Sequence, residues 1–340
     1  MHYTCVLFSE ADRQVGTALI FGAMKFLEVT EHQGRYTASL REGPAPVPQK
    51  GEVLIRVAAS GVNRADLAQI AGRYPPPPGE SDILGLEVSG TNQDTGEAVC
   101  ALLAGGGHAE YVAAPAGQVF PAPATLDLTA AAGIPEAFLT AFLNLVVEAG
   151  ATSGATALIH AGASGVGLAA IQVAKRGGAR VAATTRTAAK LGALEAAGAD
   201  LAIDSGRADF ATEIEARWGR DPVDVVLDSI GAASLAGDLR VLATGGRIVV
   251  IATLSGAVAE ADLALLMRKR ARLVGSTLRS RSRAEKAVIV GRFRKEILPE
   301  FDTGALRVTV DSVFPPARAA EAFQRMRENR NVGKILIAWQ

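Results

Sequence analysis

The fold is decided by the stretch Leu158-Ile159-His160-Ala161-Gly162-Ala163-Ser164-Gly165-Val166-Gly167. An apolar run is followed by three glycines in a tight turn, and the turn leads into an amphipathic stretch from Leu168 to Lys175 that is typical of a helix. A pyrophosphate suits such a turn, because it lies against bare backbone N–H groups at a helix N-terminus whose dipole favours negative charge. The glycines depart from the usual spacing at the first, third and sixth positions, so the prediction of a dinucleotide site also needs the surrounding sequence.

The next expected strand, Arg180 to Thr184, indicates which dinucleotide is bound. An NAD enzyme carries an Asp or Glu near the end of this strand for the ribose hydroxyls, and no acid stands there. The sequence instead offers hydroxyls and two cations, which suit a 2′-phosphate, in Thr184-Thr185-Arg186-Thr187 and Lys190. The alternative interpretation is a solvated strand end followed by a surface helix. We expect NADPH to be preferred over NADH.

Composition favours an enzyme of two domains, since 340 residues can bury two cores. Lys plus Arg and Asp plus Glu number 35 each, so no overall field draws the chain to nucleic acid or to an anionic membrane. Cys5 and Cys100 are too few for a disulfide framework or a four-cysteine metal lobe, and no apolar run approaches the length of a membrane span. A reducing, cytoplasmic setting is expected.

The first 23 residues differ in character from the rest of the chain. A short apolar stretch, Thr17 to Ala23, is preceded by Glu10 and Asp12 rather than by a basic leader, which does not match a signal peptide. We expect residues 1–23 to be a poorly ordered extension, with the first domain beginning at Met24.

The rest of the chain predicts an α/β protein. Residues 25–123 alternate short strands with turns and are expected to be β-rich, and from Pro135 the pattern changes to helix and then to strand and helix in alternation. Six parallel strands of a doubly wound sheet are predicted at 156–159, 180–184, 201–204, 223–228, 247–252 and 273–277. One long helix over 283–301, a strand near 308–313, a helix near 316–328 and a strand at 334–338 are expected to return to the first domain.

Ordered motifs along nearly the whole chain from Met24 resemble one known family. They lie at 61–67 (GVNRADL), 72–77 (GRYPPP), 83–90 (ILGLEVSG), 105–111 (GGGHAEY), 134–137 (IPEA), 275–281 (GSTLRSR) and 331–334 (NVGK). They resemble the medium-chain dehydrogenase/reductase superfamily, within it the zinc-independent quinone oxidoreductases and their tumour-suppressor-inducible branch. The resemblance implies a GroES-like β-rich catalytic domain at 24–136 and 282–340, a Rossmann NADPH-binding domain at 137–281, and a homodimer formed through the sheet edge at 273–277.

The same superfamily contains zinc alcohol dehydrogenases, whose branch needs Cys, His and Glu ligands. The resemblance implies that Asn63 stands where the zinc branch has its ligand cysteine. The Gly-His-Glu sequence that is usual in that branch is Gly85-Leu86-Glu87 in this chain. Leucine cannot bind zinc, so no metal site is expected. Without a Lewis acid to polarise an alcohol oxygen, reduction of an electron-poor quinone or enone is the expected direction.

The resemblance also implies which residues meet the cofactor. The pyrophosphate is expected at Ser164, Gly165 and Val166, and the adenosine ribose and its phosphate at Thr184, Thr185, Arg186, Thr187 and Lys190, with Ser205 where relatives often place a tyrosine. The nicotinamide is expected near Asn63, Thr140, Ala252, Thr253, Leu254, Thr277, Leu278, Arg279, Val332, Gly333 and Lys334.

Two residues are the candidates for catalysis. Tyr74 could donate a hydrogen bond to a quinone oxyanion or stack on a planar substrate. The alternative interpretation is that Tyr74 merely caps a proline-rich turn. Asn63 is the second candidate. The alternative interpretation is a loop residue whose side-chain amide is satisfied by hydrogen bonds within the protein. None of the four histidines is expected to sit near another potential ligand, and His108 and His160 are interpreted as core or loop residues rather than catalytic bases.

Three functions remain open from the sequence. The first is an NADPH:quinone oxidoreductase that transfers hydride to a quinone. The second is an NADPH-dependent enal or enone reductase. The third is a non-catalytic NADPH-binding protein, and the fold alone cannot choose among the three.

Overall fold

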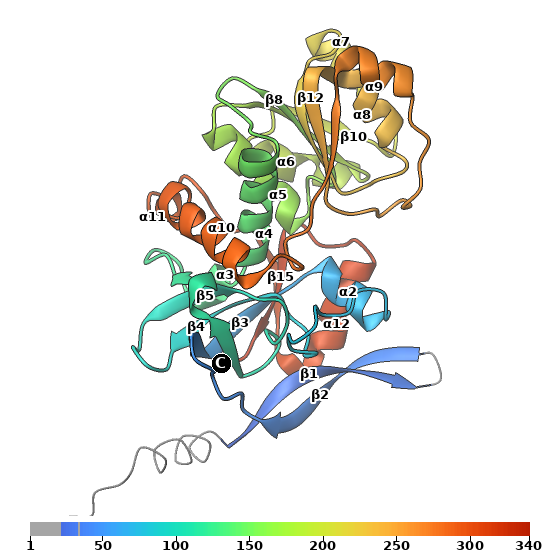
Figure 1. Cartoon of the computed structure of the whole chain (residues 1–340). Helices are drawn as coiled ribbons and strands as arrows, with labels where there is room; N and C mark the ends of the chain where they lie inside the picture. Colours follow the sequence, from blue (N-terminus) through green and yellow to red (C-terminus); the bar gives the residue numbers. More distant parts are fainter. Residues whose placement is uncertain (1–21, 33–34) are drawn as a thin grey trace, which may run out of the picture.

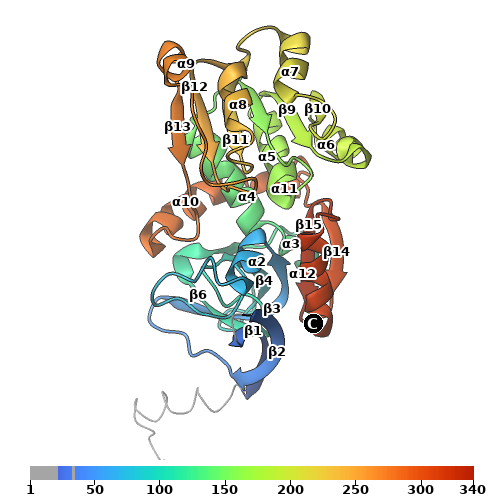
Figure 2. The same ribbon diagram turned by 90° about the vertical axis from the view of Figure 1, so that its right-hand side faces the viewer.

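The structure, a computed structural model, describes residues 22–32 and 35–340. The extension predicted for residues 1–23 therefore lies outside the described residues, apart from Gly22 and Ala23. Figures 1 and 2 show two lobes, one around a parallel sheet and one around a mostly antiparallel sheet. Helices α4 (Pro135–Phe142) and α10 (Arg283–Glu296) lie where the lobes meet.

The upper lobe in Figure 1 holds a six-stranded parallel sheet of order β10-β9-β8-β11-β12-β13. Its strands are β8 (Thr156–Ile159), β9 (Arg180–Thr185), β10 (Leu201–Asp204), β11 (Val223–Asp228), β12 (Leu242–Val250) and β13 (Arg272–Gly275). The six strands predicted from the sequence are confirmed, and the strand order reverses beside β8 as in doubly wound sheets. Strand β12 begins earlier than predicted, because Leu242 pairs with Val223 ahead of a register shift.

The strands of this sheet are apolar on both faces, which is the pattern of parallel strands buried between helices. In β8, Ile159 and its neighbour Leu158 enter two different hydrophobic clusters. The cluster around Ile159 includes residues of α4, α5 (Gly165–Arg176) and α6 (Leu191–Ala196). The cluster around Leu158 includes residues of α7 (Phe210–Trp218) and α8 (Leu235–Val241), with α9 (Leu263–Lys269) packed against it.

The lower lobe holds a seven-stranded sheet of order β14-β15-β3-β4-β5-β7, with β6 paired to β3. Its strands are β3 (Glu52–Val62), β4 (Glu87–Asn92), β5 (Ala98–Leu102), β6 (Tyr111–Pro115), β7 (Val119–Pro121), β14 (Val310–Phe314) and β15 (Lys334–Ala338). The ribbon of β1 (Ala23–His32) and β2 (Arg35–Pro44) lies below it. Because β15 pairs antiparallel with β3, the C-terminal part returns to the first lobe as predicted.

The long helix predicted over 283–301 is wrong in one respect. It is divided into α10 and α11 (Pro299–Asp302), because Pro299 lacks an N–H group and cannot continue the helical bonding. The remaining helical segments are α2 (Arg64–Ile70), η1 (Ala116–Gln118), α3 (Leu128–Ala131), η2 (Leu143–Glu148), η3 (Ala188–Lys190), η4 (Pro316–Arg318) and α12 (Ala319–Arg327). Within the described part of the chain, every helix is too short or too polar to cross a bilayer.

Candidate functional site

The turn between β8 and α5 leads directly into the N-terminus of α5. The Ser164 hydroxyl caps α5 by accepting from the Gly167 N–H at 3.0 Å. Gly165 and Val166 are the first residues of α5, so their N–H groups have no carbonyl partner inside the helix. A Cβ on Gly167 would lie 2.5 Å from the Ala161 carbonyl oxygen, which makes glycine necessary there. The predicted pyrophosphate residues therefore form one helix N-terminus, whose first N–H groups have no carbonyl partner within the helix.

The C-terminal segment closes over this turn. The Gly333 N–H donates to the Ala163 carbonyl at 2.9 Å, and Gly333 forms a parallel bridge with Ser164. A Cβ on Gly165 would come within 2.4 Å of the Lys334 side chain. The structure thus brings Val332-Gly333-Lys334 against the glycine turn, although the two segments are far apart in the sequence.

Lys334 is buried and bonds Asn63, another predicted residue, and Glu87, which was not predicted for the site. Its ammonium donates to the Glu87 carboxylate, to Asn63 Oδ1 at 2.8 Å and to the Val62 carbonyl at 3.2 Å. Asn63 Nδ2 donates to Glu87 Oε1 at 2.9 Å and to the Gly61 carbonyl at 3.1 Å. Both ends of the Asn63 amide are therefore bonded inside the protein, as in the alternative of a satisfied loop amide.

Thr184 does not offer its hydroxyl at the end of β9. Its Oγ1 lies 2.9 Å from His160 Nδ1, its carbonyl accepts from the Gly162 N–H at 2.7 Å, and the residue is 2 % exposed. Thr185 is also buried, and its carbonyl accepts from the Ser205 N–H at 2.8 Å. Thr184 therefore does not supply one of the hydroxyls predicted for the ribose, because its side chain faces the core.

Three cations gather beside this strand end. Arg186 is exposed, and Lys190 donates to the carbonyls of Asn329 and Asn331 rather than to an acid. Arg64, at the start of α2 in the other lobe, donates to the side chain of Asn329. Partial burial and the charge of Arg186 hold the pKa of Arg64 below its ordinary value, and burial is the first cause that lowers the pKa of Lys190. Sequence reasoning found Arg186 and Lys190 but missed Arg64.

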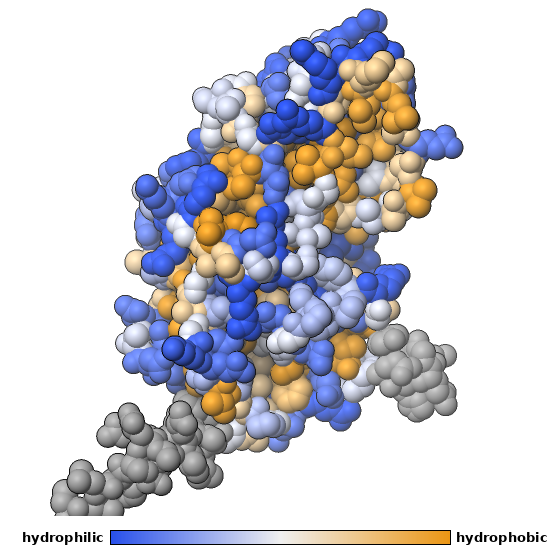
Figure 3. Space-filling model, viewed as in Figure 1, coloured by the Kyte–Doolittle hydropathy of each residue, from blue (hydrophilic) through white to orange (hydrophobic). Residues whose placement is uncertain are grey.

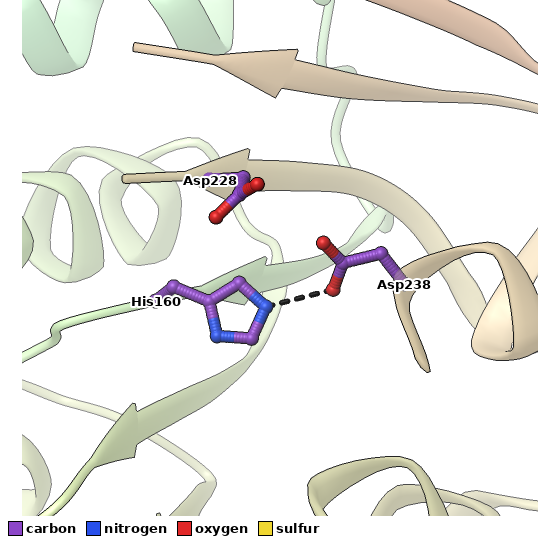
Figure 4. Close-up of side chains that lie close together, drawn as sticks. All are labelled: His160, Asp228 and Asp238. Carbon is purple, nitrogen blue, oxygen red and sulfur yellow. Dashed lines mark hydrogen bonds and ion pairs between the residues drawn. The ribbon is translucent and has the colours of Figure 1, made fainter. Parts of the chain in front are cut away.

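His160 is at the centre of a buried cluster that the sequence did not reveal (Figure 4). His160 Nε2 lies 2.7 Å from Asp238 Oδ1, and one ligand atom from each of His160, Asp228 and Asp238 falls within a group 4.8 Å across. The interpretation that no histidine is near another potential ligand is therefore wrong, because Asp238 comes from α8, 78 positions away. Burial lowers the pKa of His160, but the charge of Asp238 and its hydrogen bond raise it overall.

These three side chains do not form a cation site. Both His160 nitrogens are engaged, and the Asp228 carboxylate accepts from the N–H groups of Ile230 at 2.6 Å and Gly231 at 3.1 Å. Burial raises the pKa of Asp238, whose Oδ2 is buried without a hydrogen-bond partner in the described part of the chain. The cluster fixes β8, β9 and α8 to one another beneath the glycine turn.

Tyr74 is held by Arg279 from the opposite lobe. The Arg279 guanidinium lies over the Tyr74 ring, 5.0 Å from its centroid, and Nη1 donates to the Tyr74 carbonyl at 3.1 Å. The same guanidinium donates to the Ala104 carbonyl and to Gln69 Oε1, both at 2.7 Å. Arg279 was expected near the nicotinamide. Its buried side chain instead joins the lobes.

Glu136 lies near this group and was not among the predicted site residues. Its N–H donates to Glu87 Oε2 at 2.7 Å, and burial, followed by the charge of Glu87, raises the pKa of its carboxyl to about 8. Burial is also the first cause that raises the pKa of Tyr74, and Glu136 is the second. The only sequence signal was the motif at 134–137, which served for recognition alone.

The remaining predicted residues lie on loops after the strands and on α4. Thr140 is buried on α4, and its carbonyl accepts from Asn144 Nδ2 at 2.7 Å. Leu254, after β12, donates through its N–H to the Ser229 carbonyl, and residues 252–254 belong to that loop. Leu278 is buried after β13, beside Thr277.

Two family models match the chain, one in each lobe. Residues 49–105 match the family model of the alcohol dehydrogenase GroES-like domain, and residues 165–290 match that of the zinc-binding dehydrogenase. The quinone oxidoreductase of Lama guanicoe is 28% identical over 326 residues, covering 92% of this chain and 97% of that protein.

Two solved structures are also similar. A quinone oxidoreductase from Thermus thermophilus, solved alone and with NADPH, has a TM-score of 0.80 and 32% identity, over 93% of this chain and 100% of that one. A mycobacterial protein complexed with NADPH has a TM-score of 0.82 and 30% identity over the same shares.

The chain belongs to the medium-chain dehydrogenase/reductase superfamily. The predicted α/β fold, with a GroES-like part and a six-stranded Rossmann sheet, is confirmed by the strand order and by the solved relatives. This medium-chain dehydrogenase/reductase is an oxidoreductase by its family. In it, the N-terminus of α5, the bridge between Lys334 and Glu87, and the stack of Arg279 on Tyr74 all lie where the two lobes meet.

Proposed function

We propose that the protein is an NADPH-dependent quinone oxidoreductase that works without zinc. The observation that carries the proposal is the position of the Lys334 ammonium, bonded to both Asn63 and Glu87. These two residues stand where the zinc branch has its ligand pattern, and here a protein cation already uses their oxygens. Without a Lewis acid, oxidation of an alcohol loses the polarisation it needs, whereas reduction of a quinone needs a placed hydride donor.

The residues present fit NADPH at two places. The N-terminus of α5, at Ser164, Gly165 and Val166, suits the pyrophosphate, and Arg64, Arg186 and Lys190 supply positive charge for a 2′-phosphate. At the place proposed for the 2′-phosphate, three positive charges lie close together. Besides burial, the charge of Arg186 lowers the pKa of Arg64, and the charge of Arg64 lowers that of Lys190. Within the described residues, no acid is paired with Arg186 or Lys190. When bound, NADPH supplies the hydride.

The acceptor is proposed to bind at Tyr74. Burial keeps its phenol protonated, since the pKa is raised, so the hydroxyl can donate to a carbonyl oxygen that gains negative charge. Arg279 fixes the ring and the loop that carries it. Asn63, Thr140 and Lys334 are proposed to lie beside the nicotinamide.

A second candidate is an enal or enone reductase. Reduction of an enone also ends in an oxygen that must gain a proton, and two groups with raised pKa, Tyr74 and Glu136, are near one another. NADPH oxidation measured side by side with 1,4-benzoquinone and with a 2-alkenal separates the two. Turnover of the alkenal alone favours the second candidate, and tight NADPH binding without any turnover favours a non-catalytic binding protein.

We also propose the assembly and the setting. Strand β13 is an open edge of the sheet, and apolar side chains are exposed on it and near α9, which include Val258 at 90 %, Leu263 at 73 %, Met267 at 71 % and Leu273 at 50 % (Figure 3). A second copy paired at β13 would extend the sheet and cover this surface. Sedimentation of a monomer at micromolar concentration would contradict this dimer.

The domain boundaries are proposed to be 24–136 with 282–340, and 137–281. The setting is proposed to be cytoplasmic and reducing, and Cys100 in the core is a free thiol.

A further inference from the structure

The carboxyl of Glu136 has an unusual place on its helix. Seven of the eight residues of α4 are buried, and Glu136 is the one with partial access to solvent. It stands four positions before Thr140, so the two side chains leave the same face of the helix. Its N–H is fixed to Glu87, which itself bonds Lys334 and Asn63. Glu136 is thereby held beside the group of residues that the proposed function assigns to the nicotinamide.

The same carboxyl lacks any hydrogen bond or ion pair within the described residues, although charged groups surround it. Glu87 on β4, Asp66 on α2, Lys286 on α10 and Lys334 on β15 all act on its charge. Tyr74 and Arg279 are in turn affected by Glu136. A carboxyl in such a place holds a proton near neutral pH, because burial and Glu87 disfavour its ionised form and raise its pKa to about 8.

Lys286 has no partner of its own in the described part of the chain. It is 2 % exposed, and burial lowers the pKa of its ammonium, against the opposing charges of Glu80 and Glu136. Arg283, one turn earlier in α10, is by contrast paired with Glu52 and Glu80. A buried, unpaired ammonium near Glu136 can stabilise the carboxylate once the proton has left.

We propose that Glu136 is the residue that gives a proton to the substrate oxygen, a role that rests on the proposed function. Hydride arrives with two electrons at the quinone, one carbonyl oxygen becomes an oxyanion, and the O–H bond of Glu136 breaks as a new O–H bond forms on the substrate. Glu136 is left as a carboxylate beside Lys286 and is protonated again from water. In an enone, the same step protonates the enolate oxygen.

Tyr74 and Glu136 have different roles in this step. Burial raises the pKa of Tyr74, so the phenol donates a hydrogen bond but does not readily give up its proton. A carboxyl with a pKa of about 8 is much closer to the operating pH, which is the condition for efficient general acid catalysis. Tyr74 stabilises the oxyanion, and Glu136 neutralises it.

The test compares Glu136→Gln with Glu213→Gln, the same change at an exposed glutamate on α7. Two acceptors of nearly equal size are used, 2,5-dimethyl-1,4-benzoquinone and 2,5-dichloro-1,4-benzoquinone, since the dimethyl compound gives the more basic oxyanion. E136Q is expected to lower kcat by about 100-fold with the dimethyl compound and by less than about 10-fold with the dichloro compound. Affinity for NADPH should be unchanged, and E213Q should match the wild type.

Two further measurements separate a donor from a structural residue. In the wild type, kcat should fall as pH rises through about 8, and E136Q should lose this fall, because the protonated form is the donor. In the protein without cofactor, the infrared band of a protonated carboxyl that is present in the wild type and missing from E136Q should vanish over the same range.

Distinct outcomes overturn distinct claims. Equal losses with both acceptors, an unchanged pH profile, or no protonated carboxyl band at pH 7 would each overturn the donor role alone. A wild type that turns over neither quinone would overturn the proposed function and the donor role with it.

Discussion

The guanidinium of Arg279 lies 5.0 Å from the ring centroid of Tyr74 and donates a hydrogen bond to the carbonyl oxygen of the same residue. Arg279 follows the last strand of the parallel sheet, whereas Tyr74 belongs to the other lobe. The Arg279 side chain therefore orients Tyr74, the candidate residue for contact with the substrate, and also joins the two lobes. Any substitution of Arg279 should affect stability and substrate binding at once.

Arg279→Ala leaves Ala104, Gln69 and Tyr74 without their donor. Because a buried polar group that loses its partner costs about 1–3 kcal/mol, we expect the free energy of unfolding to fall by roughly 2–4 kcal/mol. KM for the quinone should rise, since the Tyr74 loop loses its anchor. Urea unfolding and steady-state kinetics measure both effects. Arg279→Lys should recover part of the stability but not the stack, and an unchanged KM in Arg279→Ala would contradict the orienting role.

Cofactor choice is tested at the cations beside β9. Replacing Arg186 and Lys190 together with alanine should weaken NADPH binding by about 2–4 kcal/mol, the scale of charge-assisted hydrogen bonds, and leave NADH nearly unchanged. Titration of both cofactors measures this. The control is Arg294 and Lys295 changed together to alanine, since both are exposed on α10. Equal losses for NADPH and NADH would contradict a 2′-phosphate site.

Removal of the Tyr74 hydroxyl tests its role in catalysis. Tyr74→Phe keeps the ring over which Arg279 lies, so we expect kcat to fall by about 10 to 100-fold, or roughly 1.4 to 2.7 kcal/mol, at constant NADPH affinity. The smaller loss is expected for a quinone, because Glu136 rather than Tyr74 is proposed to supply the proton. If kcat stays unchanged in Tyr74→Phe while Tyr74→Ala raises KM, the residue only stacks on the substrate.

The sequence predicted the elements of the fold better than the contacts of the site. The six parallel strands were predicted because each is an apolar run bounded by glycines or polar residues, and the glycine turn of α5 is a local signal. The contacts that were missed join residues distant in the chain. His160 meets Asp238 78 positions away, Tyr74 meets Arg279 205 positions away, and Glu87 meets Lys334 247 positions away.

Such pairs depend on how the two lobes pack, and no local pattern encodes this. Asn63 illustrates the difficulty. Asn63 belongs to the motif at 61–67 and lies directly before α2, but the sequence cannot show that Lys334 uses its oxygen. The hydroxyl of Thr184 was likewise placed at the strand end, and only packing reveals that it turns inward to His160.

The buried pair of His160 and Asp238 should make stability depend on pH. The pKa of both groups is raised in the folded protein, so the native state binds more protons than the unfolded state once pH exceeds the ordinary values. For His160, the stabilisation is complete below about 6.5 and is lost as pH rises through its higher folded value, with a slope of up to about 1.4 kcal/mol per pH unit. Urea unfolding between pH 6 and 9 measures the slope. His160→Gln should reduce the slope to the part that the raised pKa of Glu136 contributes, and an equal slope in the variant would contradict the assignment.

Activity should not depend on a metal ion. Lys334 places a fixed positive charge against Glu87 and Asn63, and its ammonium competes with any cation for their oxygens. We therefore expect full quinone turnover after prolonged treatment with a chelator, and no stimulation when zinc is added back. Lys334→Met leaves the Glu87 carboxylate buried and unpaired, which should cost about 3–5 kcal/mol of stability, and Glu87→Gln in the same chain should restore part of it. Unfolding measurements on the two variants give this difference. One equivalent of zinc per chain in the purified protein, together with loss of activity to the chelator, would show instead that the lysine leaves room for a metal and that the hydride acceptor is polarised by it.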